Sequence, residues 1–304
     1  MRRFTIDSMQ LTGVYAPLPT PFADDDRLDP ARLRGALEWW VASPLAGFVV
    51  LGSNGEAVLM DDDECDRVVD VARAIVPPHR PLIAGTGRES TRATIRATKR
   101  AAELGADAVL VRTPGFFKSQ MTGDVFLRHY MAVADASPVP VLLYNFPAVT
   151  GVNLLPATVG RLAEHPNIVG MKESGNDIGH IADLVSNTPS QFSILAGSGS
   201  IFLAALCAGV SGGILALGAL LPDPCVRLFE LARDQRYDEA RALQRRLLPI
   251  ARLISSGYGV PGLKAALRIV GCDVGKPRLP LEPIPAMAVA VLKEALTRFE
   301  EVNA

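Results

Sequence analysis

Apolar and polar positions along the chain form two alternating kinds of segment. Short runs of apolar or small residues are typical of strands buried on both faces of a sheet. Longer segments, in which apolar residues recur every three or four positions, are typical of helices that pack on a sheet. The runs predict eight strands, at residues 11–18, 47–51, 81–84, 108–111, 139–146, 168–172, 192–195 and 213–217.

A helix is predicted after each of the first seven strands. The first has Asp29 as its N-cap and Pro30 in its first turn, both typical of a helix start. The seven helices are expected at residues 30–41, 61–75, 90–104, 123–136, 156–165, 177–186 and 200–208. Buried strands separated by about 30 residues that include a helix pair in parallel. Eight such units predict an α/β fold, a (β/α)8 TIM barrel. An open doubly wound sheet is the alternative, but no G-x-G-x-x-G fingerprint opens the first helix.

The predicted strands stop near Pro222, and only helices follow. These are expected at residues 225–232, 237–254, 261–270 and 285–299, with a proline-rich link at 276–285. We therefore expect a barrel that carries the active site at residues 1–222 and a C-terminal helical extension at residues 223–304.

Composition excludes several classes of function. The 304 residues are 49% hydrophobic and 21% charged, with a net charge of −1, as in an ordinary globular protein. No dense stripe of Lys and Arg is present, so we expect neither a nucleic-acid nor a membrane partner. Cys65, Cys207, Cys225 and Cys272 have no C-x-x-C spacing, which indicates free thiols in a reducing compartment. Residues 1–8 contain no apolar leader segment, so we expect a cytoplasmic location.

One uncharged stretch has the length of a membrane span. Residues 201–222 carry no charge, but Gly209, Ser211, Gly212 and Gly213 interrupt the stretch in the middle. A short buried helix, a glycine turn and a buried strand explain this pattern better than a transmembrane helix.

A lysine stands near the end of the sixth predicted strand. Alternation places Gly170, Lys172 and Ser174 on one face of that strand. An unpaired ammonium in apolar surroundings must find a partner, reach solvent or lose its proton, and the last outcome produces a nucleophilic amine. A structural lysine that reaches the rim is the alternative interpretation.

Two other strand ends carry polar groups. The second predicted strand is followed by Gly-Ser-Asn-Gly-Glu at residues 52–56, whose backbone N–H groups and side chains could bind a carboxylate. Tyr144 shares a face with Leu142 near the end of the fifth strand. A capped glycine turn and a core tyrosine are the ordinary interpretations of these two features. Because active sites of TIM barrels lie at the carboxyl ends of the strands, we expect Ser53, Tyr144 and Lys172 to converge on one cavity.

Competing chemistries have less support. The four histidines, His79, His129, His165 and His180, fall in helices or loops without paired spacing for zinc, so we expect no metal. The Gly-Thr-Gly at residues 85–87 and the Gly-Ser-Gly at 197–199 lack the phosphate-loop pattern, so we expect no cofactor. Arg112 lies near the end of the fourth strand, but its facing is ambiguous, and we assign it no role.

Together these segments resemble a known family, the pyruvate-dependent class I aldolases and lyases. That family includes dihydrodipicolinate synthase, N-acetylneuraminate lyase and 4-hydroxy-2-oxoglutarate aldolase. The resemblance spans almost the whole chain and is carried by the motifs at residues 52–56, 144–151, 170–174 and 195–198. The amino-acid sequence at residues 52–56, 165–172 and 195–198 is most similar to that of the 4-hydroxy-2-oxoglutarate aldolase branch.

The resemblance implies a role for each candidate residue. It implies Lys172 as the Schiff-base lysine, Tyr144 as the proton-transferring phenol, and Ser53 and Asn54 as ligands of the pyruvate carboxylate. Two further residues, Gly197 and Ile214, are implied as lining of the pocket. It also implies a homotetramer built as a dimer of dimers, with a small 2-oxo acid as its substrate.

Two positions depart from the family pattern. Dihydrodipicolinate synthases usually carry an arginine for the second substrate's carboxylate just before the Thr-Gly at residues 150–151, where this chain has Val149. Many members also place a tyrosine after the Thr-Pro of strand four, where this chain has Phe116 and Phe117, so the hydroxyl relay lacks this member.

The predicted reaction is reversible aldol cleavage of a 4-hydroxy-2-oxo acid, such as 4-hydroxy-2-oxoglutarate, to pyruvate and an aldehyde. The alternatives within the family are 4-hydroxy-tetrahydrodipicolinate synthase and a 2-oxo-3-deoxy sugar acid aldolase or dehydratase. A barrel that binds 2-oxo acids without turnover is the alternative of another class.

Overall fold

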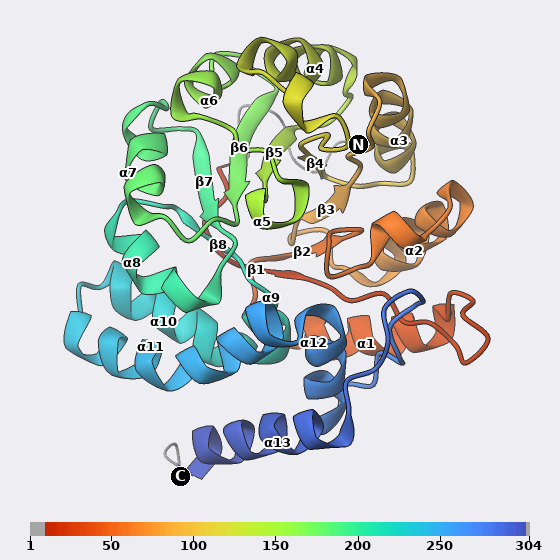
Figure 1. The fold of residues 1–304 in the computed structure, drawn as a ribbon, viewed down its shortest axis with the longest axis vertical. Coiled ribbons are helices and arrows are strands. Elements are labelled where there is room, and N and C mark those ends of the chain that lie inside the picture. The colour runs from red at the N-terminus through yellow and green to blue at the C-terminus, as the bar shows by residue number, and fades with distance from the viewer. Residues whose placement is uncertain (1–9, 302–304) are drawn as a thin grey trace.

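The barrel is closed by parallel strands, each paired with the next along the chain (Figure 1). The computed structural model describes residues 10–301, so the predicted absence of a leader at residues 1–8 lies outside the described residues. Within residues 10–301 the eight strands are β1 (Gly13–Pro17), β2 (Gly47–Val50), β3 (Leu82–Gly85), β4 (Ala108–Arg112), β5 (Val141–Asn145), β6 (Ile168–Glu173), β7 (Ser193–Ala196) and β8 (Gly212–Ile214). The predicted TIM barrel is confirmed.

Helices connect the strands and cover the outside of the barrel (Figure 1). They are α1 (Pro30–Val41), α2 (Asp62–Ile75), α3 (Thr91–Glu103), α4 (Gly123–Ala136), α5 (Pro147–Thr150), α6 (Pro156–Leu162), α7 (Ile178–Ser186) and α8 (Phe202–Cys207). Short 3-10 helices lie at Ala57–Leu59, Lys118–Gln120 and Gly199–Ile201. As predicted, Asp29 caps α1: its side chain accepts from the backbone N–H of Arg32. Asp61, which the prediction placed inside the second helix, is instead the N-cap of α2 and forms a capping box with Glu64.

The prediction for a strand at residues 213–217 is wrong at its C-terminal end. β8 ends at Ile214, and a helix, α9 (Ala216–Leu220), begins two residues later. Ala and Leu favour helix, and a short apolar run does not distinguish the two states. The uncharged stretch at residues 201–222 is thus divided mainly among α8, β8 and α9. No helix within residues 10–301 has the length and apolar character needed to cross a bilayer.

In the part of the chain that the structure describes, four further helices follow α9: α10 (Pro222–Arg233), α11 (Tyr237–Arg252), α12 (Gly259–Ile269) and α13 (Ala286–Glu301), with a π-helical turn at Leu253–Gly257. The link between α12 and α13 runs beside the segment that joins β1 to α1 (Figure 1). There the Lys276 ammonium donates to the Asp24 carbonyl, and the Arg278 backbone N–H donates to Glu56. The C-terminal segment therefore contacts the loop that follows β2.

Apolar side chains form two layers, because alternate residues of a strand point to opposite faces of the sheet. The outer layer packs between strands and helices. The inner layer fills the barrel and consists of Leu11, Tyr15, Val49, Ile83, Ala108, Leu110, Leu142, Tyr144, Val169, Leu195 and Ile214. As predicted, Tyr144 shares its face with Leu142. It belongs to the inner layer and lies at the C-terminal end of β5.

Candidate active site

Neighbouring strands bring two of the predicted residues side by side at the carboxyl end of the barrel. Tyr144 of β5 is the register partner of Lys172 of β6, and Arg112 of β4 is the register partner of Tyr144. The three residues therefore occupy one level on consecutive strands, at the end of a TIM barrel where active sites lie.

Lys172 is buried, with 5% of its surface exposed. Its Nζ lies 4.5 Å from the centre of the Tyr144 ring. Among the residues that the structure describes, no side chain or carbonyl forms an ion pair or hydrogen bond with this Nζ. The amine therefore lacks the counter-ion that a purely structural buried lysine requires.

The phenol of Tyr144 meets a hydroxyl from the opposite side of the mouth. Its oxygen lies 3.2 Å from Ser53 Oγ, and either group can donate. The Tyr144 ring also stacks on Phe146, with 6.0 Å between the ring centres. The structure thus brings Lys172, Tyr144 and Ser53 together.

The loop that carries Ser53 is bounded by two residues in the left-handed region. Leu51 has φ 57° and Glu56 has φ 55°, which is uncommon for residues with a side chain. A Cβ at Gly85 of β3 would lie 1.9 Å from the Leu51 carbonyl oxygen, so glycine there permits the turn. The backbone N–H groups of Ser53 and Asn54 make no hydrogen bond within residues 10–301, which leaves them available to a carboxylate.

A buried ion pair anchors the same loop from the C-terminal side. Glu56 and Lys264 are each 1% exposed in the side chain, and Lys264 Nζ lies 2.6 Å from Glu56 Oε1. Lys264 also donates to the carbonyls of Thr20 and Lys276, at 2.7 and 2.9 Å. Burial lowers the pKa of Lys264, and the charge of Glu56 opposes this shift. The pair was not predicted from the sequence, although a lysine within the apolar run of α12 is a signal for it.

Glu173 fixes the ends of β5 and β6 on the face opposite Lys172. It is 1% exposed, accepts from the Asn145 side chain at 2.7 Å and also accepts from the Gly175 backbone. It lies 3.7 Å from His180, whose pKa it raises. Asn145 in turn donates to Asn153. Asn145 and Glu173 stand within the motifs at residues 144–151 and 170–174, but the sequence predicted no role for them, because their contacts join separate elements.

A cavity of about 340 Å³ opens beside Tyr144. Ser53, Tyr144 and Arg112 belong to its lining, whereas Lys172, Asn54, Gly197 and Ile214 do not. Lys172 lies against the ring of Tyr144, and Ile214 is fully buried in the inner layer. Gly197 follows β7, where a Cβ would lie 2.0 Å from Ser174 Oγ. The roles of Gly197 and Ile214 in a substrate pocket stay predictions.

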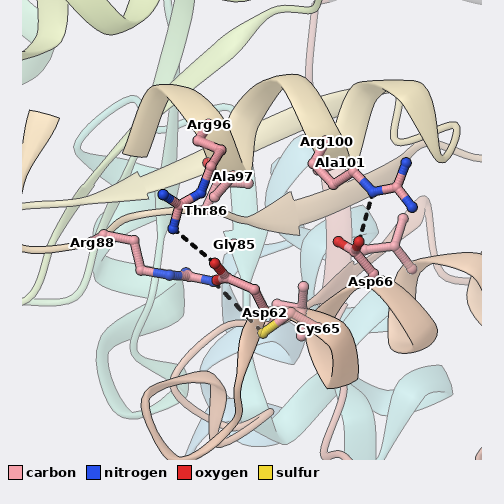
Figure 2. A pocket seen from close by; sticks show the side chains of 12 residues that line it. Asp62, Cys65, Asp66, Gly85, Thr86, Arg88, Arg96, Ala97, Arg100 and Ala101 are labelled. Atoms are coloured by element: carbon pink, nitrogen blue, oxygen red, sulfur yellow. Dashed lines mark hydrogen bonds and ion pairs between the residues drawn. The ribbon is translucent and has the colours of Figure 1, made fainter. Parts of the chain in front are cut away.

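A second cavity, of about 220 Å³, lies between α2 and α3 (Figure 2). Its charged side chains are paired with one another: Asp62 accepts from Arg96 at 2.9 Å, and Asp66 accepts from Arg100 at 2.6 Å. Arg88 donates to Asp62 there at 3.3 Å. Within residues 10–301, no group of three or more His, Cys, Asp or Glu side chains could hold a metal ion.

The profile of the Dihydrodipicolinate synthetase family matches residues 10–298. The chain belongs to this family. The family members are pyruvate-dependent class I aldolases, and the chain is a carbon–carbon lyase of this type, as the resemblance implied.

Relatives of this chain carry the names of more than one enzyme activity. The chain is 38% identical over 292 residues to a 4-hydroxy-tetrahydrodipicolinate synthase from Exiguobacterium sp., with 96% of this chain and 99% of the relative covered. It is 36% identical over 296 residues to a protein of Emericella nidulans named "Probable 4-hydroxy-2-oxoglutarate aldolase, mitochondrial", with 96% of each covered.

Solved structures of the family share the fold. The dihydrodipicolinate synthase of Thermotoga maritima superposes with a TM-score of 0.91 at 31% identity, with 96% of this chain and 99% of that chain covered. The prophage protein YagE of E. coli K12, solved in complex with pyruvate, gives a TM-score of 0.90 at 28% identity, with 96% and 99% covered.

The two positions that depart from the family pattern lie on the surface of the chain. Val149 is 61% exposed, Phe116 is 77% exposed and Phe117 is 67% exposed. The rings of Phe116 and Phe117 meet edge to face, with 5.1 Å between their centres. None of these three side chains carries a charge or a hydroxyl group.

Proposed function

We propose that this chain cleaves 4-hydroxy-2-oxoglutarate to pyruvate and glyoxylate through a Schiff base on Lys172. The proposal rests on the Lys172 amine, which is buried against the ring of Tyr144 and has no counter-ion within residues 10–301. Such an amine, beside a phenol that contacts a second hydroxyl, is suited to imine chemistry.

The reaction follows from the chemistry of a 2-oxo acid. The neutral amine of Lys172 attacks the C2 carbonyl, and loss of water produces a protonated imine. When the C3–C4 bond breaks, the imine accepts its electron pair and becomes an enamine, while the 4-hydroxyl loses its proton and leaves as the aldehyde group of glyoxylate. Protonation of the enamine at C3 and hydrolysis of the resulting imine release pyruvate and restore the amine.

The other candidate residues supply proton transfer and binding. Tyr144 accepts the proton of the 4-hydroxyl and exchanges it through Ser53, which is half-buried and contacts the phenol. The backbone N–H groups of Ser53 and Asn54 bind the C1 carboxylate. The roles of Gly197 and Ile214 as lining of the substrate pocket stay part of the proposal, because both residues lie outside the lining of the cavity of about 340 Å³.

The choice of substrate rests on two observations. The motifs at residues 52–56, 165–172 and 195–198 are most similar to those of the 4-hydroxy-2-oxoglutarate aldolase branch, and one named relative is such an aldolase. Val149 stands where, by the resemblance, dihydrodipicolinate synthases carry the arginine that binds their second substrate. The names of most other relatives favour a second candidate, condensation of pyruvate with L-aspartate semialdehyde.

A parallel assay of four substrates tests the proposal. We expect faster pyruvate release from 4-hydroxy-2-oxoglutarate than from 2-oxo-3-deoxy sugar acids or N-acetylneuraminate, and slow pyruvate consumption with L-aspartate semialdehyde. Coupling each reaction to lactate dehydrogenase measures pyruvate directly. Efficient condensation with the semialdehyde would establish the second candidate instead, and turnover of a sugar acid alone would place the chain in another branch.

Removing the phenol hydroxyl of Tyr144 is expected to lower kcat more than it lowers the affinity for the substrate. Tyr144→Phe should lower kcat by about 10²–10⁴-fold, the usual contribution of a general acid–base group. Ser53→Ala should lower kcat by a smaller factor, because water can replace one hydroxyl of the path. Steady-state pyruvate release gives kcat and KM for both variants, with Phe117→Leu as an exposed control. Near-wild-type turnover in Tyr144→Phe would mean that another group moves the protons.

A further inference from the structure

Arg112 faces the inside of the barrel mouth. It follows Ala108 and Leu110 at intervals of two along β4, and both belong to the inner apolar layer. Its side chain is 19% exposed and lines the same cavity as Ser53 and Tyr144. The facing that the sequence left ambiguous is therefore inward.

The position of Arg112 relative to Lys172 suits a small substrate. Arg112 is paired with Tyr144, and Tyr144 with Lys172, on strands that lie about 4.8 Å apart. A Cβ at Gly87 would lie 2.5 Å from the Arg112 backbone nitrogen, so glycine lets the segment after β3 pack closely on this strand end. A substrate bound covalently to Lys172 on β6 thus lies two strands away from the Arg112 cation on β4, at the same end of the barrel.

Glu89 holds the guanidinium of Arg112 without saturating it. Arg112 Nη2 donates to Glu89 Oε1 at 3.0 Å, and Nη1 donates to the Thr113 carbonyl at 3.1 Å. The other carboxylate oxygen of Glu89 accepts from the backbone N–H groups of Gly115 and Phe116. A guanidinium has five N–H donors, so the remaining ones, which have no partner within residues 10–301, can bind a carboxylate.

The other cations near the cavity are directed elsewhere. Arg88 lines both cavities, but its guanidinium points to Asp62 and Cys65 between α2 and α3 (Figure 2). Lys118 is exposed and packs against Gly151, outside the lining of the cavity. Val149, which by the resemblance stands where dihydrodipicolinate synthases carry an arginine, has no charge.

We propose that Arg112 binds the distal carboxylate of the substrate and makes the chain selective for 2-oxo acids that carry a second carboxylate. The inference rests on the proposed function, because it takes Lys172 as the group that holds the 2-oxo carbon. The planar fork of arginine matches a carboxylate with two parallel hydrogen bonds, which lysine cannot provide.

Two inert ligands separate this selectivity from catalysis. 2-Oxoglutarate and 2-oxopentanoate have carbon chains of the same length and no 4-hydroxyl to cleave, but only the first has a distal carboxylate. The wild-type chain is expected to bind 2-oxoglutarate about 10–100-fold more tightly, as one charge-assisted hydrogen-bonded contact provides. Arg112→Met should remove this preference and leave the affinity for 2-oxopentanoate unchanged. Titration calorimetry measures all four affinities.

Two further variants keep the test decisive. Arg112→Lys retains the charge but not the planar fork, so it should keep only part of the preference for 2-oxoglutarate. This variant also provides a test if Arg112→Met fails to fold. Lys118→Met, a nearby exposed cation, should keep all of the preference. Equal binding of the two ligands by the wild type, or a preference that survives in Arg112→Met, would overturn the assignment, and loss of the preference in Lys118→Met would transfer it to Lys118.

Failure of the carboxylate site and failure of the proposed reaction give different results. A chain that prefers 2-oxoglutarate through Arg112 but releases no pyruvate from 4-hydroxy-2-oxoglutarate would refute the reaction and keep the carboxylate site. A chain that cleaves 4-hydroxy-2-oxoglutarate with the same kcat/KM in Arg112→Met would refute the site and keep the reaction.

Discussion

Borohydride added together with pyruvate is expected to inactivate the protein irreversibly and to attach a reduced pyruvate adduct to Lys172. The reason is that reduction converts a reversible imine into a stable secondary amine, and only an amine without a counter-ion forms the imine readily. Lys172→Ala should lower pyruvate release by about 10⁴-fold or more, the scale on which loss of a covalent nucleophile acts. Peptide mass spectrometry locates the adduct, and the coupled assay measures the loss.

The chain contains its own control for this experiment. Lys264 is more deeply buried than Lys172, with 1% against 5% of its surface exposed, but an ion pair with Glu56 and two carbonyl acceptors occupy its ammonium. We expect no adduct on Lys264, no adduct without pyruvate, and no effect of metal chelators. An adduct on any lysine other than Lys172, or full activity in Lys172→Ala, would overturn the assignment of the Schiff base to Lys172. The absence of any adduct together with no pyruvate release from any of the substrates would favour a barrel that binds 2-oxo acids without turnover.

The comparison of these two lysines shows what sequence can predict here. Lys172 lies in a short apolar run with strand periodicity, and the ends of parallel strands meet at one rim, so its proximity to Tyr144 followed from strand order alone. The barrel followed from the same periodicity, because eight apolar strands with intervening helices have few other solutions. Ser53 was placed by the same argument, through the loop after β2.

Other features depended on contacts that no local pattern encodes. Two of the partners of Lys264, Glu56 and the Thr20 carbonyl, lie more than 200 residues away along the chain. The inward facing of Arg112 depends on where β4 ends, and predicted strand ends are the least certain part of a periodicity argument. α9 was missed because its short apolar run suits helix and strand equally.

The second large effect is expected from Lys264→Met, which should lower the free energy of unfolding by about 3–5 kcal/mol. The substitution is similar in size but leaves the Glu56 carboxylate buried and uncompensated. It also removes the donor to the carbonyls of Thr20 and Lys276. A loss of this size is a large part of the stability of a typical domain, about 5–15 kcal/mol. Urea unfolding followed by circular dichroism measures it.

Lys276→Met is the matched control, because its ammonium is more exposed and lies 3.7 Å from Asp26. That variant should lose no more than about 1 kcal/mol, as expected for a surface pair. If the buried pair is responsible, the double variant Lys264→Met with Glu56→Gln should lose less than the sum of the single variants, since each single change leaves the other group unpaired. A loss in Lys264→Met no larger than in Lys276→Met would contradict the anchoring role.

If Lys264 anchors the loop, pyruvate should also bind more weakly to Lys264→Met, because Glu56 follows Ser53 and Asn54 in the same loop.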